Sequence, residues 1–275
     1  MGAIIWLASY PKSGNTWMRS FLHNLLRNPT ESYDINTLTD FTYGEAQVRW
    51  FRLFDPRPDT EYSLADVQRM RPQVHRHLTG LSADSIFVKT HNALLEDQGM
   101  PLVTMEVTAG AIYMIRDPRD VVISYSHHQG QSIDYIIDMM RDQAACTAGD
   151  GSNVYEYLSS WSGHVRSWTH TPNRSLLVLR YEDMLDQPVK SFGAVARFLG
   201  LDVARPRLEK AMKLSSFKVL KAQEQRKGFI ERPKRADAAF FREGRAGQWR
   251  KLLTPAQIAR IEADHGEEMR RFGYL

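Results

Sequence analysis

Four short apolar runs of strand length recur along the chain, at residues 4–9, 86–89, 111–115 and 175–180. Polar or turn-forming residues bound each run, which is the pattern expected of short buried strands. The first run ends at a turn-forming stretch, residues 10–15, with the sequence Tyr-Pro-Lys-Ser-Gly-Asn. We therefore expect these four segments to form a central sheet.

Helical patterns lie between and after these runs. From residue 15 onward, Trp17, Phe21 and Leu25 share one helical face until Asn28-Pro29 ends the pattern. Strands that alternate with helices predict an α/β fold, in which a mostly parallel central sheet is flanked by helices. Ligands bind such sheets at the carboxyl ends of the strands. The remaining predicted helices are residues 118–128, 153–168, 188–199 and 255–272.

Two segments, residues 40–82 and 129–152, mix aromatic and charged side chains without a clear period. We interpret them as insertions over the carboxyl edge of the sheet, within a single domain that spans residues 1–275. The first segment contains aromatic residues that could line an apolar pocket or belong to the core: Phe41, Tyr43, Trp50, Phe51 and Phe54.

The composition is that of an ordinary globular protein, because 43% of the 275 residues are hydrophobic and 25% are charged. The single cysteine, Cys146, cannot form an intrachain disulfide, which fits a reducing compartment. No apolar run approaches the roughly 20 residues that a membrane span needs. These features predict a cytoplasmic protein without a membrane partner.

Positive charge is concentrated in residues 218–251, which contain eleven Lys or Arg and four Asp or Glu. The whole chain, by comparison, has a net charge of only +4. A basic region of this kind suits a polyanionic ligand. On charge alone, a solvated basic surface or a nucleic-acid patch explains it better.

The turn at residues 10–15 is the first candidate site. Small residues between a strand and a helix leave backbone N–H groups free for an anionic oxygen, and the helix N-terminus adds positive potential. Lys12 contributes a charge and Thr16 a hydroxyl donor. The turn is not a Walker A loop, because Lys12 precedes Gly14. We predict that it binds a phosphate.

A second candidate lies where the run at 111–115 ends. Arg116 follows directly, and Ser124 comes eight residues later on the next predicted helix. A guanidinium can bind a phosphate through two parallel hydrogen bonds, and a serine hydroxyl can donate another. The alternatives are a helix cap, with Asp117 at the helix start and Arg119 solvated, or a Walker B aspartate of a kinase.

A third candidate is His91, at the end of the run 86–89 and thus on the same sheet edge as Lys12. A histidine that titrates near neutrality can take a proton from an attacking hydroxyl. Most of the nine histidines are expected to be structural or solvated. The pair His127-His128 has no evident third ligand, so we predict no metal site.

Together these segments resemble the cytosolic-type sulfotransferases, which have a P-loop-like fold and use 3′-phosphoadenosine 5′-phosphosulfate (PAPS) as donor. The resemblance rests on residues 10–17, on Lys89-Thr90-His91 and on Arg116 with Ser124. It rests also on residues 241–249, which resemble the family's C-terminal Arg-Lys-Gly element, and two weaker matches at residues 179–184 and 215–218 complete it. The six matches occur in the family's order and cover the scaffold, but not the segments that would form an acceptor pocket.

The resemblance implies a donor site in which the turn holds the 5′-phosphosulfate and Trp17 stacks on adenine. Arg116 and Ser124 would bind the 3′-phosphate, and the segment 241–249 would close over it, so residues 218–249 are a candidate lid. The implied donor-binding residues are Lys12, Ser13, Gly14, Asn15, Thr16, Trp17, Arg116, Ser124, Tyr181, Ser215, Phe217, Arg242 and Gly244.

The sequence departs from the family near its C-terminal end. Glu243 replaces a lysine, and a carboxylate beside a phosphate is unfavourable unless it points away. The tripeptide 226–228 matches the family's Arg-Lys-Gly literally, but it lacks the following Ala-Gly-x-Trp, so we prefer 242–244. The family's dimer element is also altered here, at Arg250, Thr254-Pro255 and Ala259, which leaves a monomer and a homodimer open.

We therefore expect a metal-independent sulfotransferase that sulfates a hydroxyl of a small alcohol or phenol. His91 would take the proton, Lys12 would stabilise the leaving phosphate, and Lys89 would assist near the sulfuryl oxygens. Ser124 would couple 3′-phosphate binding to Lys12. Two alternatives stay open: an ATP-dependent kinase of a small molecule, and a nucleotide or nucleic-acid binder that uses residues 218–251. The sulfotransferase interpretation predicts no nucleic-acid partner.

Overall fold

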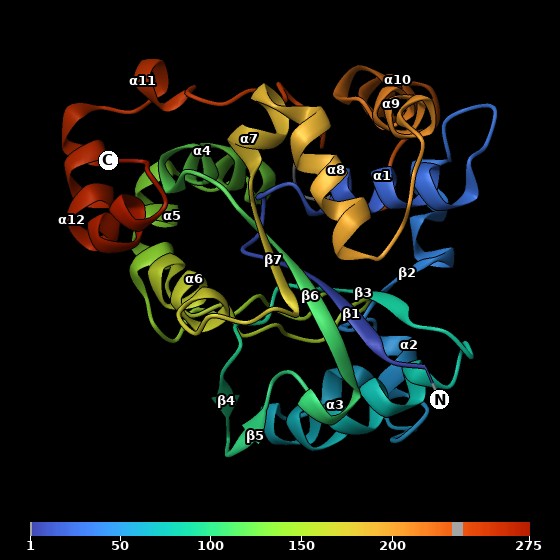
Figure 1. Cartoon of the computed structure of the whole chain (residues 1–275). Helices are drawn as coiled ribbons and strands as arrows, with labels where there is room; N and C mark the ends of the chain where they lie inside the picture. The colour runs from blue at the N-terminus through green and yellow to red at the C-terminus, as the bar shows by residue number, and fades with distance from the viewer. Residues whose placement is uncertain (1, 233–238) are drawn as a thin grey trace.

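The computed structural model describes residues 2–232 and 239–275. Five parallel strands form one sheet (Figure 1) in the order β2 (Thr42–Gly44), β3 (Ile86–Thr90), β1 (Ile4–Ser9), β6 (Thr108–Ile115) and β7 (Leu176–Arg180). A short antiparallel pair, β4 (Glu96–Asp97) and β5 (Met100–Pro101), lies apart from it. The predicted α/β fold with a parallel central sheet is confirmed.

Side chains alternate across β1, so the sheet separates two hydrophobic clusters. Trp6 and Ala8 pack on one face, whereas Leu7 packs on the other. The first face is covered by α3 (Leu64–Thr79), α4 (Pro118–Gln129), α5 (Ile133–Arg141), α6 (Trp161–Thr169) and α12 (Pro255–Arg271). The second is covered by α1 (Asn15–Arg27), α7 (Tyr181–Asp186), α8 (Pro188–Phe198) and α9 (Arg205–Leu214).

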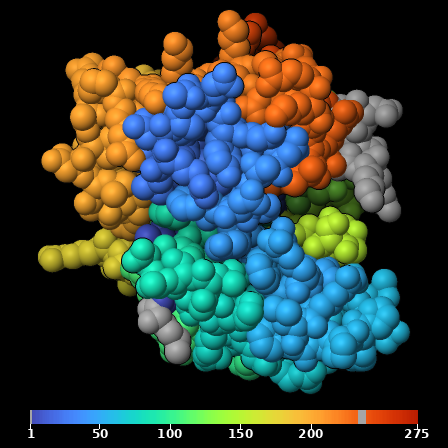
Figure 2. All heavy atoms as spheres, turned by 90° about the vertical axis from the view of Figure 1, so that its right-hand side faces the viewer, coloured from blue at the N-terminus to red at the C-terminus, as the bar shows by residue number. Residues whose placement is uncertain are grey.

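A third, smaller cluster joins the segment that follows α1 to the segment around α10 (Phe217–Lys227). Ile35 packs with Leu220 of α10 and with Phe241. The backbone N–H of Ile35 also donates to Gln223 Oε1 at 3.0 Å. Figure 2 shows the residues around α1, in blue, lying beside the orange helices of the C-terminal third. This contact brings α10 and the segment after it over the β1–α1 connection.

Two predicted elements need correction. The helix expected at 153–168 begins only at Trp161, because residues 153–157 are extended and pair with other segments. The segments 42–44 and 64–79 lie within the predicted insertion 40–82, yet they form the edge strand β2 and the helix α3, which packs on the sheet. The short helices α2 (Val48–Phe51) and α11 (Trp249–Leu252) were also not expected.

A buried ionic cluster explains why α3 lacks the regular spacing of apolar residues that would have predicted a helix. Glu45, just after β2, is completely buried, and its Oε2 lies 2.6 Å from Nη1 of Arg71 on α3. Its Oε1 accepts hydrogen bonds from Thr90, at 2.9 Å, and from Asn92. Burial by itself would raise the pKa of Glu45, but Arg71 and His75 lower it to about 2. The face of α3 that packs inward is therefore partly charged.

Within residues 2–232 and 239–275, no helix combines the length and hydropathy that crossing a bilayer requires.

The replacement Arg71→Met tests this cluster. It leaves the Glu45 carboxylate buried without its cation, and we expect the free energy of unfolding to fall by about 3–5 kcal/mol in urea titrations at neutral pH. The folded-state pKa of Glu45 lies below its unfolded value, so the stabilisation is lost as the pH falls toward 2 and the two proteins converge. The control Arg69→Met removes an exposed partner of Asp66 on the same helix and should cost about 1 kcal/mol or less. Equal losses for the two variants would contradict this account.

Candidate active site

The turn between β1 and α1 has the backbone geometry of an anion site. Lys12 has φ of 67° and Gly14, the N-cap of α1, has φ of 104°. A side chain at Gly14 would be strained at that φ, and its Cβ would lie 3.0 Å from the ring of Tyr181. Left-handed residues in such a turn direct successive N–H groups to one side, toward the N-terminus of α1.

The Lys12 side chain lies inside the protein rather than in solvent. Its Nζ is 3.3 Å from Nδ1 of His128 and 3.9 Å from the centre of the Phe240 ring. Burial, together with the nearby Arg116 guanidinium, lowers the pKa of Lys12 to about 7. An anionic ligand would restore the charged state, because it supplies the counter-charge that the site lacks.

Arg116 connects the turn to the C-terminal segment. Its Nη1 donates to the carbonyl of Lys12 at 3.0 Å, and its Nη2 donates to the carbonyl of Arg245 at 3.1 Å. The guanidinium carbon lies 4.4 Å from the centre of the Tyr181 ring. Its Nε is buried and has no hydrogen-bond partner among residues 2–232 and 239–275. A buried donor without a partner is costly, and a phosphate oxygen would satisfy it.

The helix-cap alternative is only partly correct. The Asp117 side chain does cap α4, where it accepts from the N–H of Arg119. Arg119 is not solvated, however. It is 4% exposed, pairs with Asp117 at 2.8 Å and stacks on the Trp249 ring at 3.8 Å. Asp117 and Arg119 therefore form the cap of α4, whereas Arg116 is not part of it and lines the cavity.

The segment 241–249 is held against α4 by one carboxylate. Asp120 accepts from the N–H groups of Gly247, at 2.5 Å, and Trp249, at 3.1 Å. At Gly244, where φ is 63°, a Cβ would come within 2.3 Å of the Phe217 ring, so only glycine fits. These contacts place Arg242 at the edge of the cavity, with its guanidinium bonded to Gln248 at 2.5 Å.

The tripeptide Arg-Lys-Gly at 226–228 does not lie at the edge of the cavity. Lys227 pairs with Asp34 at 2.6 Å, and Gly228 ends α10. Neither lines the cavity, whereas Arg242, Glu243 and Gly244 do. The Glu243 carboxylate is half-exposed and lies 3.9 Å from the Arg245 guanidinium.

His91 follows β3 and has a defined tautomer. Its Nδ1 lies 2.7 Å from the carbonyl oxygen of Ser9, which can only accept, so Nδ1 carries the proton and Nε2 is left as a base. Its backbone N–H donates to Glu156 Oε1 at 2.7 Å. Burial and the nearby Lys89 keep the pKa of His91 well below its usual value, so the ring is neutral at physiological pH.

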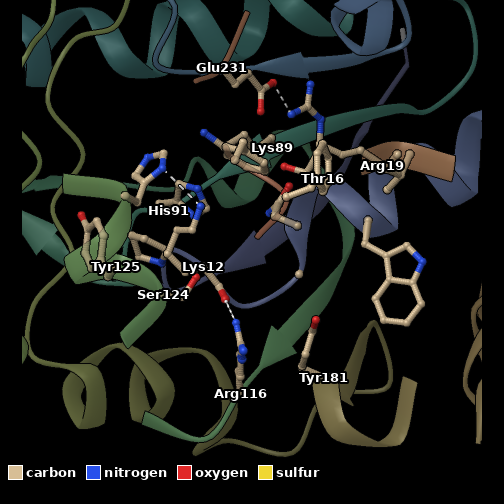
Figure 3. A pocket seen from close by; sticks show the side chains of 18 of the residues that line it. Lys12, Thr16, Arg19, Lys89, His91, Arg116, Ser124, Tyr125, Tyr181 and Glu231 are labelled. Carbon is tan, nitrogen blue, oxygen red and sulfur yellow. Dashed lines mark hydrogen bonds and ion pairs between the residues drawn. The ribbon is translucent and has the colours of Figure 1, made fainter. Parts of the chain in front are cut away.

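One cavity of about 1310 Å³ joins these groups at the carboxyl ends of the strands (Figure 3). Sites for a single small ligand measure roughly 300–1,000 Å³, so this one has room for two. All but two of the predicted site residues line it: Lys12, Gly14, Asn15, Thr16, Trp17, Lys89, His91, Arg116, Ser124, Tyr181, Phe217, Arg242 and Gly244.

Two predicted residues do not line the cavity. Ser13 is completely buried, and its hydroxyl has no partner among the described residues. Ser215 is also buried, and its hydroxyl donates to the Ala211 carbonyl at 2.8 Å, so it serves to end α9. The neighbouring Ser216 faces the cavity instead. The predicted lid, residues 218–249, includes residues 233–238, which lie outside the described part of the chain.

Sequence reasoning missed several residues that line the cavity. Arg19 pairs with Glu231 at 2.6 Å, as Figure 3 shows, and Gln47 and Glu156 come from segments that pair with each other. Of these residues, only Arg19 could have been predicted from the sequence, because it lies one helical turn after Thr16 and so on the same face of the helix. None of the five aromatic candidates for a pocket lines this cavity. Phe51, for example, is fully buried in the core.

Within residues 2–232 and 239–275, no group of three or more His, Cys, Asp or Glu side chains is arranged to hold a metal ion.

Comparison with known proteins gives a consistent result. A family model described as "Sulfotransferase domain" matches residues 4–273. The chain is 29% identical to cytosolic sulfotransferase 16 of Arabidopsis thaliana, over 98% of this chain and 77% of that protein. It is 25% identical to sulfotransferase 1A1 of Canis lupus familiaris, over 97% of this chain and 83% of that protein.

Two solved structures share the fold at 20% sequence identity. Mouse sulfotransferase SULT7A1 complexed with PAP gives a TM-score of 0.63 over 98% of this chain and 85% of that one. Retinol dehydratase in complex with androsterone and the inactive cofactor PAP gives 0.65 over 97% of this chain and 80% of that one.

The lowered pKa of Lys12 predicts pH-dependent anion binding. Lys12 is charged below about pH 7 and neutral above it, so inorganic sulfate, whose charge is constant near neutrality, should bind more weakly as the pH rises. We expect several-fold weaker binding at about pH 8.5 than at about pH 6 in calorimetric titrations. Lys12→Met should bind weakly at both values. A wild-type affinity that is independent of pH would contradict the assignment.

Proposed function

The chain belongs to the sulfotransferase family and transfers the sulfuryl group of PAPS to a hydroxyl; we propose that His91 is the general base and that the β1–α1 turn, Arg116 and residues 242–244 bind the donor. The observation that carries the proposal is the tautomer of His91. Its Nδ1–H is held by the Ser9 carbonyl, which leaves Nε2 as a basic nitrogen in the cavity that Lys12 also lines.

The residues at the donor end fit a nucleotide with phosphates at two positions. Lys12 and the N-terminus of α1 suit the 5′-phosphosulfate, whereas the unpartnered Nε of Arg116 suits the 3′-phosphate. Trp17, whose buried Nε1 has no partner among the described residues, lies edge-to-face with Tyr181 at 5.8 Å, and both line the cavity. These two rings supply a place for adenine.

The side chains of the cavity divide the chemical task among them. When bound, PAPS supplies the sulfuryl group, which carries less charge than a transferring phosphoryl. His91 Nε2 accepts the proton of the attacking hydroxyl, and Lys12 stabilises negative charge on the departing 5′-phosphate oxygen. Lys89 and Ser124 line the same cavity, where Lys89 would assist near the sulfuryl oxygens and Ser124 would couple 3′-phosphate binding to the position of Lys12.

The comparisons also bear on the acceptor and on location. Related structures contain retinol or androsterone beside PAP, and relatives are named cytosolic sulfotransferases. We propose on this basis that the acceptor is a small hydroxylated molecule and that the protein works in the cytoplasm.

Replacing His91 tests the assignment of the base. His91→Ala removes the proton acceptor, and we expect kcat to fall about 10²–10⁴-fold. The dissociation constant of adenosine 3′,5′-bisphosphate (PAP), the product left when PAPS has lost its sulfuryl group, should change little. Sulfation would be followed with radiolabelled PAPS and PAP binding by calorimetry. His170→Ala, which removes an exposed histidine at the end of α6, is the control. Turnover of His91→Ala near the wild-type value would overturn the assignment.

Nucleotide preference tests the donor site. Without magnesium, PAP should bind at least tenfold more tightly than ADP in calorimetry, because only PAP has the 3′-phosphate that Arg116 and Arg242 bind. Arg242→Ala should remove much of that preference, whereas the matched change Arg226→Ala, at the literal tripeptide outside the cavity, should not. Equal affinities, or a magnesium-dependent preference for ADP, would favour the kinase alternative.

A further inference from the structure

The strand order divides the cavity into two ends. The proposed donor residues follow β1, β6 and β7, on one side of the sheet's centre. On the other side, β3 and β2 bring in His91 and the segment 44–47. The base thus stands between the donor end and a second end, over β3 and β2, that is open to an acceptor.

The second end carries several amide and carboxylate groups. The aromatic residues of 41–54 lie elsewhere, but Tyr125, His128 and Phe240 line the cavity. The centre of the Phe240 ring lies 3.9 Å from Lys12 Nζ. Aromatic faces beside a few placed polar groups suit a ligand that combines an apolar face with hydroxyls. The polar residues that line it are Gln47, Gln131, Asp150, Asn153, Glu156 and Glu231.

These groups are fixed in place before any ligand binds. The loop 147–156 pairs with the segment 46–48, where the N–H of Val48 donates to Ser152 at 2.9 Å and the N–H of Val154 donates to Ala46 at 2.8 Å. The N–H of Thr147 closes the loop on the carbonyl of Glu156 at 2.9 Å. Side chains on such a pinned loop can select hydrogen-bonding partners by geometry.

Two of these side chains present oxygens that can accept further hydrogen bonds. Gln47 Oε1 is buried and has no hydrogen-bond partner among the described residues. Glu156 is 6% exposed, and burial raises the pKa of its carboxyl although Lys89 opposes the shift. Its one hydrogen bond to His91 comes from the backbone and leaves further acceptor capacity. Buried acceptors of this kind are costly unless a ligand supplies the donors.

We propose that this end of the cavity recognises a neutral polyhydroxylated acceptor, such as a sugar or a cyclitol. Hydroxyls next to the attacking one donate to Glu156 and Gln47. Arg19 pairs with Glu231, and Lys89 lies near Glu156, so these carboxylates already have counter-charges and a neutral acceptor fits. The inference rests on the proposed function, because it takes His91 as the base.

Matched pairs of acceptors separate this inference from an apolar preference. Cyclohexanol and myo-inositol share a ring but differ in the number of hydroxyls, and 2-naphthol and 2-naphthyl β-glucoside share an aryl group. With radiolabelled PAPS, we expect kcat/KM to be at least tenfold higher for the polyhydroxylated member of each pair. A site built to bond hydroxyls rejects analogues that lack them.

The variant Gln47→Leu removes one acceptor oxygen at nearly constant volume. It should lower kcat/KM at least tenfold for the glucoside, leave 2-naphthol within about threefold, and leave PAP affinity unchanged. Gln73→Leu, on the exposed side of α3, is the matched control and should change none of these values.

Each outcome bears on a different statement. Equal or faster turnover of the apolar members, or no turnover of either polyol by a protein that still binds PAP, would overturn the polyol inference. Failure to bind PAP would instead overturn the proposed donor site.

Discussion

One guanidinium, that of Arg116, holds the site together. It donates to the carbonyl of Lys12 in the β1–α1 turn and to the carbonyl of Arg245 near the C-terminus, and it lies against the ring of Tyr181. Four segments that are far apart in the sequence therefore meet around one side chain. Because Arg116 directly follows β6, its position is set by the sheet rather than by a flexible loop.

The sheet also explains why donor and acceptor occupy different ends of one cavity. The chain leaves β1 in the centre and builds strands on both sides of it, and the carboxyl ends open a crevice where the direction changes. The ends of β6 and β7 bring cationic and aromatic groups, whereas β3 brings His91 and the segment after β2 brings Gln47 together with the loop 147–156 that pairs with it. The base lies at the boundary, where proton removal has to occur.

Much of the fold and of the donor end could be predicted from the sequence. The turn at 10–15, Arg116 and His91 each stand directly after an apolar run, so a local pattern is enough to place them at one edge. The predictions failed for β2 and α3, where the pattern of apolar and polar residues does not show the element. The strand β2 has only three residues, too few to show a period. The helix α3 buries Gln68, Arg71 and His75, so its inner face is not apolar.

The sequence by itself determined the family, the alternation of strands with helices, and the residues that follow the ends of the strands. Only the tertiary structure decided that Ser215 lies outside the cavity, that the predicted aromatic residues do not line it, and that Gln47 and Glu156 do. The physical reason is the range of the interactions. Strand runs, turns and caps depend on neighbours within a few residues, whereas a pocket forms from side chains that come together only when distant segments, here 46–48 and 147–156, pair across the folded chain.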